Sequence, residues 1–114
     1  MASKRNESVV KEGSSNVFAD LGMPEPEEEL AKAQLASHIR EAIRQRKLTQ
    51  AATAALVGLD QPKISALING RLTGFSSDRL LRCLTALGQD VEIVVTKSRH
   101  SRDRGRLRVR EAAA

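Results

Sequence analysis

The sequence predicts a mainly α fold, in which four to five short helices form one small domain followed by a single β-strand. The chain has 114 residues, enough for one domain with tails. Hydrophobic residues make up 40% of it but only Phe18 and Phe75 are aromatic, so the core must be aliphatic. Apolar residues recur at helical spacing between capping residues, which indicates short amphipathic helices. A chain of this size buries a modest core, so dimerisation would add stability.

The first long helix is predicted to begin within Met23–Glu29. Proline suits a helix entry, and carboxylates in the first turn favour the positive end of the helix dipole. The apolar stripe that should face the core is Ala31, Leu35, Ile39 and Ile43, with Leu30 and Ala42 beside it. The residues assigned to the exposed side are Lys32, Arg40, Arg44 and Arg46.

The segment Thr49–Asn69 has the residue pattern of a helix-turn-helix. Thr49 and Asp60 are favourable N-caps for two short helices, and Gly58 allows the positive φ that a sharp helix exit needs. Ala54 is small where the second helix crosses the first. The residues expected to turn inward are Val57, Leu59, Ile64 and Leu67. The alternative is a helical bundle in which the Gly58 turn is accidental.

A further helix is predicted from the Ser76 cap to Leu87, with Gly88 as its stop signal. Its inner face is expected to consist of Leu80, Leu81, Leu84 and Leu87.

The Val91–Thr96 segment changes to a β-branched, strand-like pattern. A lone strand at the end of a helical domain needs a partner for its backbone donors and acceptors. We expect the same strand of a second subunit to pair with it across a dimer axis. The candidate dimerisation residues are Val91, Ile93, Val94 and Val95. The alternatives are pairing with the Val17 region of the same chain or with the sheet edge of another protein.

Charge divides the chain into three regions. Residues 97–114 contain seven Lys/Arg and two Asp/Glu, a balance of +5, so residues 1–96 sum to zero. Met1–Glu29 has three bases and seven acids, whereas Arg40–Arg82 has eight bases and three acids. We therefore predict a flexible acidic arm at 1–22, a helical DNA-binding and dimerisation domain at 23–96, and a basic flexible tail at 97–114.

The second helix of the predicted motif would face a groove of DNA. Gln61 can pair bidentately with adenine, Pro62 and Ala66 offer apolar surface to a thymine methyl group, and Lys63 can reach guanine or phosphate. The full set of candidate DNA-binding residues is Gln50, Gln61, Pro62, Lys63, Ser65, Ala66, Asn69, Arg71 and Arg79. For each charged residue taken alone, the alternative is a solvated surface role. The arginines of the tail can track phosphates or only solubilise the chain end.

Enzyme chemistry, cofactors and metals are not expected. No nucleophile–base pair, phosphate-binding glycine loop or paired-carboxylate site stands out, and His38 and His100 are isolated, which argues against zinc. The single cysteine, Cys83, is expected to be a packed structural thiol in a reduced, cytoplasmic protein. No apolar run approaches the length of a membrane span.

The sequence resembles the Xre (Cro/CI-type) helix-turn-helix family, and more narrowly the HigA-type antitoxins of type II toxin–antitoxin operons. The resemblance covers roughly residues 16–96. Three stretches and their order carry it: NVFADLGMPEPEEELAKAQLA, LTQAATAALVGLDQPKISALINGRLTGFS and DRLLRCLTALGQDVEIVV. Thr53 departs from the family, which more often has alanine or an apolar residue there, and the arginine-rich tail is not a general family feature.

The resemblance implies a lambda-repressor-like domain that acts as a dimeric repressor of its own operon on inverted-repeat double-stranded DNA. It also implies neutralisation of a RelE/HigB-like ribonuclease toxin, for which the acidic arm and its apolar residues Val17, Phe18 and Leu21 are the candidate toxin-binding site. The alternatives are a stand-alone phage or metabolic regulator without a toxin, and a protein-interaction module that uses the motif as a scaffold.

Overall fold

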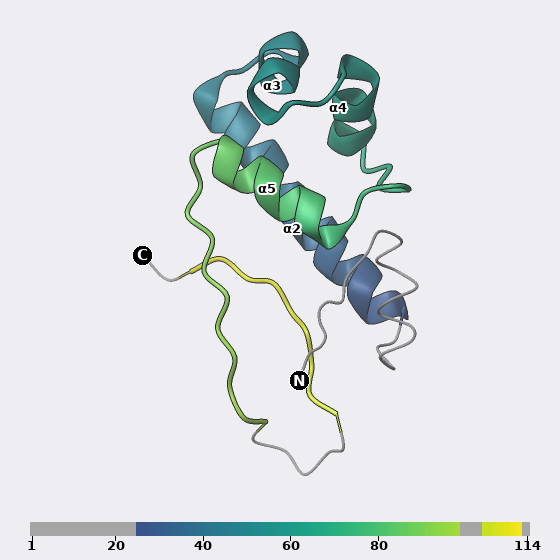
Figure 1. The fold of residues 1–114 in the computed structure, drawn as a ribbon, viewed down its shortest axis with the longest axis vertical. Helices are drawn as coiled ribbons and strands as arrows, with labels where there is room; N and C mark the ends of the chain where they lie inside the picture. Colours follow the sequence, from purple (N-terminus) through teal and green to yellow (C-terminus); the bar gives the residue numbers. More distant parts are fainter. Residues whose placement is uncertain (1–24, 99–103, 113–114) are drawn as a thin grey trace.

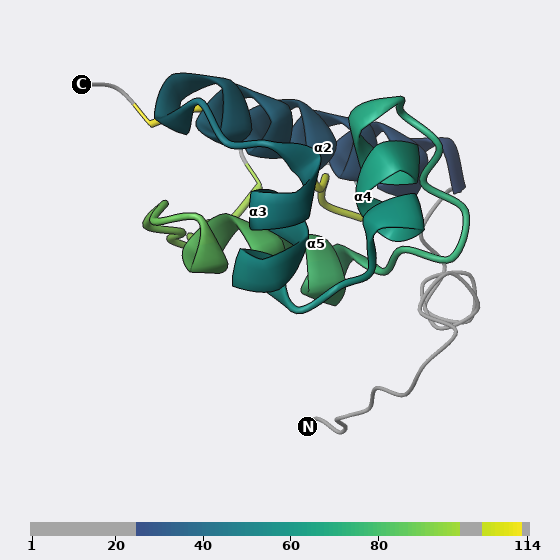
Figure 2. The ribbon, with the colours of Figure 1, turned by 90° about the horizontal axis from the view of Figure 1, so that it is seen from above.

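The computed structural model describes residues 25–98 and 104–112. Four helices lie in this part of the chain, namely α2 (Glu25–Arg46), α3 (Gln50–Val57), α4 (Gln61–Ile68) and α5 (Ser77–Ala86). The long helix α2 lies against α5, and the short pair α3 and α4 sits at one end of these two helices (Figures 1 and 2). The mainly helical prediction is confirmed, and none of these helices is long and apolar enough to cross a membrane.

The predicted stripe of α2 is buried: Ala31, Leu35, Ile39, Ala42 and Ile43 all belong to the core. Two assignments on this helix are wrong. Leu30 is 58% exposed, because it lies five residues from Leu35 and so points well away from the stripe at about 3.6 residues per turn. Lys32 is only 6% exposed, because it lies seven residues from Ile39 and so shares its face.

The three predicted N-caps are confirmed. The side chain of Thr49 accepts a hydrogen bond from the Ala52 N–H at 3.0 Å, Asp60 from the Lys63 N–H at 3.1 Å, and Ser76 from the Arg79 N–H at 3.1 Å. Each bond satisfies one of the N–H groups that a helix start leaves without a partner in the helix. These caps therefore account for where α3, α4 and α5 begin.

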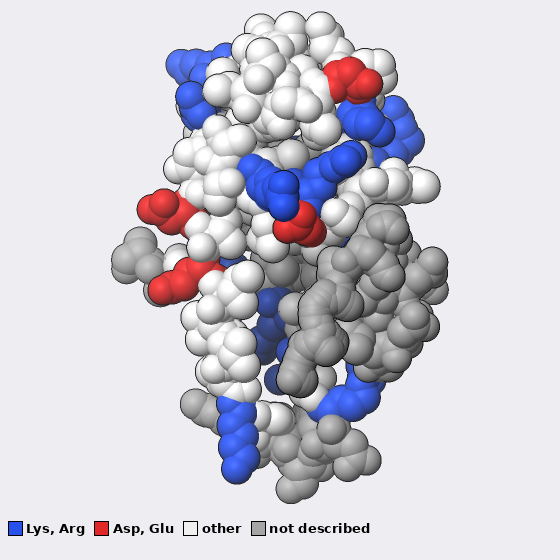
Figure 3. Space-filling view, viewed as in Figure 1, with Lys and Arg blue, Asp and Glu red and all other residues white. Residues whose placement is uncertain are grey.

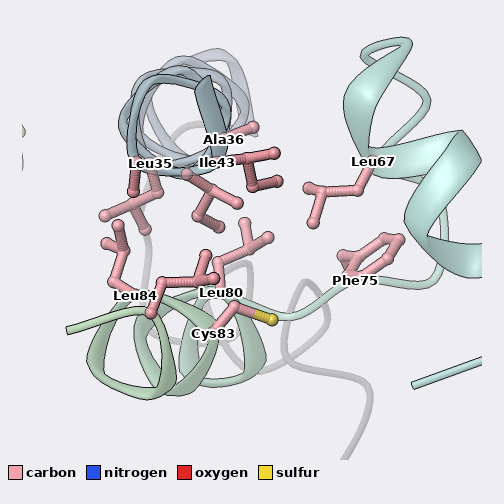
Figure 4. Packing of buried hydrophobic residues seen from close by; sticks show 11 residues of the cluster. Leu35, Ala36, Ile43, Leu67, Phe75, Leu80, Cys83 and Leu84 are labelled. Carbon is pink, nitrogen blue, oxygen red and sulfur yellow. The ribbon is translucent and has the colours of Figure 1, made fainter. Parts of the chain in front are cut away.

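The core lies between α2 and α5 and is closed from one side by α4 and the loop after it. Leu35 and Ile43 of α2 point toward Leu80 and Leu84 of α5, while Leu67 and Phe75 enter from the side (Figure 4). The predicted inner face of α5 needs one correction, because Leu81 is only partly buried at the edge of the core. Cys83, three residues after Leu80 and four before Leu87, lies on the buried face and is 3% exposed.

The residues predicted to form a strand have no ladder partner in the described part of this single chain. Residues 91–98 form a drawn-out stretch that leads away from the helices (Figure 1). Ile93, Val94 and Val95 are 74%, 70% and 90% exposed. The strand and its pairing therefore remain predictions.

The chain then returns along α2 through residues 104–112 (Figure 1). The Leu107 N–H donates to Glu27 Oε2 at 2.5 Å and the Val109 N–H donates to Gln34 Oε1 at 3.3 Å. Val109 also packs against the core. The expectation of a wholly solvated tail is thus too simple for this segment, because the alternation of Leu107 and Val109 with arginines gives it an apolar side.

Candidate nucleic-acid interface

The candidate interface is the α3–α4 pair, whose turn depends on Gly58. This residue has φ 77°, in the left-handed region that glycine tolerates. Its N–H and that of Leu59 both donate to the Ala54 carbonyl, at 2.9 and 3.1 Å, which ends α3 at this point. Ala54 is buried, and its small side chain suits the close approach of α4. The predicted exit from the first helix is therefore confirmed in its detail.

Two fully buried side chains, Ile64 and Leu67, fasten α4 to the body of the domain. Val57 and Leu59, also predicted to turn inward, are partly buried against the core. Pro62 points away from Ile64 and Leu67, whereas Gln61 and Lys63, three residues before Ile64 and four before Leu67 respectively, flank the buried face. All three of these N-terminal residues are exposed.

The remaining candidate residues are accessible as well. Ser65 and Ala66 are half-buried on α4, and Gln50 is exposed in the first turn of α3. Arg71 follows α4 and Arg79 lies on α5, and both are exposed. The structure thus leaves every residue of the sequence-predicted surface exposed or partly exposed.

Asn69 ends α4 as well as belonging to the candidate DNA-binding set. Its Nδ2 donates to the Ser65 carbonyl at 2.8 Å and lies 3.4 Å from the Ser65 hydroxyl oxygen. The amide nitrogen is therefore engaged in closing the helix, and the side-chain oxygen remains as an acceptor for a ligand.

The charges of the interface lie around the motif rather than on it. α3 contains no charged residue, and Lys63 is the only one in α4. Lys and Arg side chains gather over α5 in the middle of the face shown in Figure 3, and again beside α4. On α5, Arg82 pairs with Asp78 at 3.1 Å. The surface of α3 and α4 is therefore nearly uncharged, and cations lie at its border.

Thr53, the residue that departs from the family pattern, is completely buried in α3. Its hydroxyl donates to the Thr49 carbonyl at 2.8 Å, so its polar atom has a partner inside the helix. The substitution therefore adds no unsatisfied polar group beneath the motif.

Arg46 was assigned to the exposed side of α2, yet it also links two elements. Its Nη1 donates to the Leu87 carbonyl at 3.1 Å, which joins the end of α2 to the end of α5. The distance of 41 residues between the two partners explains why no local pattern indicates this bond.

Within residues 25–98 and 104–112, no group of three or more His, Cys, Asp and Glu side chains could hold a metal ion. The candidate toxin-binding residues Val17, Phe18 and Leu21, together with His100, lie outside the described residues.

The single cysteine, Cys83, is buried. Burial raises the pKa of its thiol, and the positive charge of Arg79 partly opposes this by lowering it.

Comparison with known proteins agrees with this geometry. A family model described as a helix-turn-helix domain matches residues 17–96. A solved structure whose description assigns it to the XRE family of transcriptional regulators is 47% identical, with a TM-score of 0.73. The match covers 78% of this chain and 100% of that one. No curated protein matches the sequence.

Proposed function

This chain belongs to the Xre family of helix-turn-helix regulators, and we propose that it represses transcription from its own operon as the antitoxin of a type II toxin–antitoxin pair. The observation that carries the DNA-binding part is the exposed N-terminal turn of α4, a helix that the buried Ile64 and Leu67 anchor to the domain. A short helix anchored in this way can enter a major groove with its first residues against the base edges.

In this proposal Gln61 and Lys63 read bases, with Pro62, Ser65 and Ala66 forming the rest of the reading surface. Gln50 and the N–H groups at the start of α3 hold a phosphate. Arg71, Arg79 and the free oxygen side of Asn69 border the surface, where the two arginines contact phosphates. The charges at 71 and 79 would then raise affinity for any DNA sequence, whereas Gln61 would set the sequence preference.

Binding to the DNA upstream of the gene tests this surface, with fluorescence anisotropy as the readout. We expect the Gln61→Ala, Lys63→Ala double variant to bind at least about tenfold more weakly than the natural chain. The matched control is Arg44→Ala, Gln45→Ala, which removes one cation and one glutamine from exposed positions of α2, outside the α3–α4 surface. Equal affinity of the natural chain and the first variant would refute the surface.

The repressor is proposed to act as a homodimer. Val91, Ile93, Val94 and Val95 would pair with the same segment of a second copy, which supplies the missing ladder partner and covers exposed apolar surface. Two recognition helices related by a two-fold axis would meet half-sites about 34–36 Å apart, or a multiple of that distance.

The antitoxin part rests on the acidic arm, in which Met1–Glu29 contains three bases and seven acids. Such an arm suits a basic, RNA-cleaving partner, and Val17, Phe18 and Leu21 would supply its apolar contacts. Co-purification with the product of the neighbouring gene is the test. Replacing these three residues by alanine should abolish capture while promoter binding persists, and unchanged capture would remove the arm from the proposal.

The stand-alone regulator remains the second candidate, because the DNA-binding observations fit it equally well. A stand-alone regulator would show the same loss of promoter binding in the Gln61→Ala, Lys63→Ala variant. It would differ in having no small toxin-like gene next to its own gene.

A further inference from the structure

Two extended segments, residues 91–98 and 104–112, lie at the end of the molecule away from α3 and α4 (Figure 1). Residues of both segments line an open cleft. The cleft has a volume of about 560 Å³. Thr96 and Lys97 line it from one segment, and Gly105, Arg106, Arg108 and Arg110 line it from the other. Residues 91–97 and 104–112 form no backbone ladder with each other, so each keeps backbone groups available on the side of the cleft.

The segment 104–112 already has one of its two edges occupied. The N–H groups of Leu107 and Val109 donate to Glu27 and Gln34 of α2. Successive N–H groups of an extended chain point to opposite edges, so those of residues 106, 108 and 110 face the other way. That edge is the one an additional strand could use.

The side chains of this segment also divide into two kinds. Arg106, Arg108 and Arg110 are exposed, whereas Val109 packs on the core and Leu107 is only 36% exposed. This alternation, with a period of two residues, gives a basic face and an apolar face, as in a strand at the edge of a sheet.

The segment 91–96 has a complementary alternation. Val91, Ile93 and Val95 fall on one face and Glu92, Val94 and Thr96 on the other, with Asp90 in register with Glu92. If the two segments were neighbours in one sheet, Val91, Ile93 and Val95 would share a face with Leu107 and Val109. Glu92 and Asp90 would then share the opposite face with the three arginines, where opposite charges on adjacent strands attract.

We propose that the cleft receives the 90–96 strand of a second copy of this chain, so that segment 104–112 flanks the partner's strand rather than its own. This inference rests on the homodimer of the proposed function and deepens it by assigning the tail to the interface. The occupant is argued from charge, since segment 90–96 contains two carboxylates and the cleft is lined by arginines and a lysine.

Two-fold symmetry determines the order of the strands. If each 90–96 strand enters the other copy's cleft, the two strands lie side by side in the centre, and each tail lies outside the strand of the other copy. The central pair runs antiparallel. Because each tail runs opposite to its own 91–98 segment (Figure 1), it runs parallel to the partner strand, which makes a mixed four-stranded sheet.

The arrangement can be tested by charge reversal at exposed positions only. The reversed-tail variant is Arg106→Glu, Arg108→Glu, Arg110→Glu, and the reversed-strand variant is Asp90→Lys, Glu92→Lys. Each variant alone brings like charges together at both tail–strand contacts of the dimer. By sedimentation equilibrium we expect each to dimerise at least about tenfold more weakly than the natural chain.

Mixing the two variants separates contact between copies from contact within one chain. In a mixed dimer the natural tail of one copy meets the natural strand of the other, and the reversed tail meets the reversed strand. The proposal therefore predicts that an equimolar mixture recovers dimerisation as a heterodimer. A tail that pairs with its own strand predicts recovery only in one chain that has all five substitutions, and that result would overturn the proposal.

Two further outcomes are informative. If the reversed-tail variant dimerises as tightly as the natural chain, the tail is not part of the interface, while strand pairing and the proposed function stand. If the natural chain is monomeric at all concentrations, both this inference and the proposed homodimer fail, and promoter binding by the α4 surface is judged from the anisotropy experiment. Far-ultraviolet circular dichroism of each variant checks that the helices are retained.

Discussion

Lys47 adopts a left-handed backbone conformation, φ 55°, where α2 ends. The Leu48 N–H donates to the Ile43 carbonyl at 3.1 Å, as in a helix end that reverses sharply. A side chain with a Cβ atom is strained by roughly 1 kcal/mol in this region, and glycine is not. We therefore expect Lys47→Gly to stabilise the fold by about 0.5–1 kcal/mol in urea denaturation.

The control for this substitution is Ala33→Gly, at an exposed position inside the same helix. It should destabilise by about 1 kcal/mol, because glycine is a poor helix former. If both variants were destabilised alike, relief of strain at Lys47 would not be the cause.

Cys83 gives a second prediction at the scale of one residue. Burial raises the pKa of its thiol, and the reactive thiolate is therefore scarce in the folded protein. We expect an aromatic disulfide reagent at pH 8 to label the native chain at least about tenfold more slowly than the urea-unfolded chain. Because folding raises the pKa of this thiol, the protonated thiol contributes to the free energy of unfolding. That contribution is fully present below the pKa of Cys83 in the unfolded chain and is lost as the pH rises through its pKa in the folded chain. Equal labelling rates would contradict the buried position.

Lys32 and Leu30 show why side-chain type alone misleads at this scale. The sequence predicts the charged residue outside and the apolar residue beside the stripe, yet helical phase puts Lys32 inside and Leu30 outside. The long stem of lysine can lie along apolar surface, and its Nζ is 3.9 Å from Glu29 Oε2. The angular positions of Leu30 and Lys32 around the helix, taken relative to Leu35 and Ile39, would have predicted which of the two is buried.

At the scale of the element, the turn between α3 and α4 depends on the backbone of Gly58. A Cβ atom added there would meet nothing within 4 Å, so the effect of Gly58→Ala comes from its φ of 77° alone. We expect a loss of about 1–2 kcal/mol in the free energy of unfolding. Weaker promoter binding should accompany it if α4 shifts.

Gly58→Asn is the matched control, because asparagine tolerates the left-handed region better than alanine and the space around Gly58 is open. It should lose less stability than Gly58→Ala. Equal losses in the two variants would show that the turn conformation is not responsible.

The elements that sequence could predict are those whose determinants are local. Thr49, Asp60 and Ser76 cap helices through residues three positions away, and Gly58 ends α3 through its own backbone. The Arg46–Leu87 bond and the contact of Val109 with α2 join distant parts of the chain, so no local pattern indicates them. In the candidate interface, the exposure of Pro62 follows from the helical phase of Ile64 and Leu67. The side-chain bond of Asn69 to Ser65 does not follow from that pattern.

At the scale of the whole molecule, the exposed residues Ile93, Val94 and Val95 are the apolar segment that the proposed homodimer would cover. Monomers rarely expose such a contiguous apolar segment without a partner. If the dimer and the fold are coupled, the melting temperature must depend on protein concentration, because assembly stabilises the folded state by mass action. We expect the melting temperature, measured by calorimetry, to rise by about 2–4 °C for each tenfold increase in protein concentration.

The control is the Ile93→Asp variant, which puts a charge in the proposed contact without disturbing the helical core. It should melt at a lower temperature that is independent of concentration. A natural chain whose melting temperature is also independent of concentration would mean that the helices are stable alone, and that the exposed segment serves a partner other than a second copy.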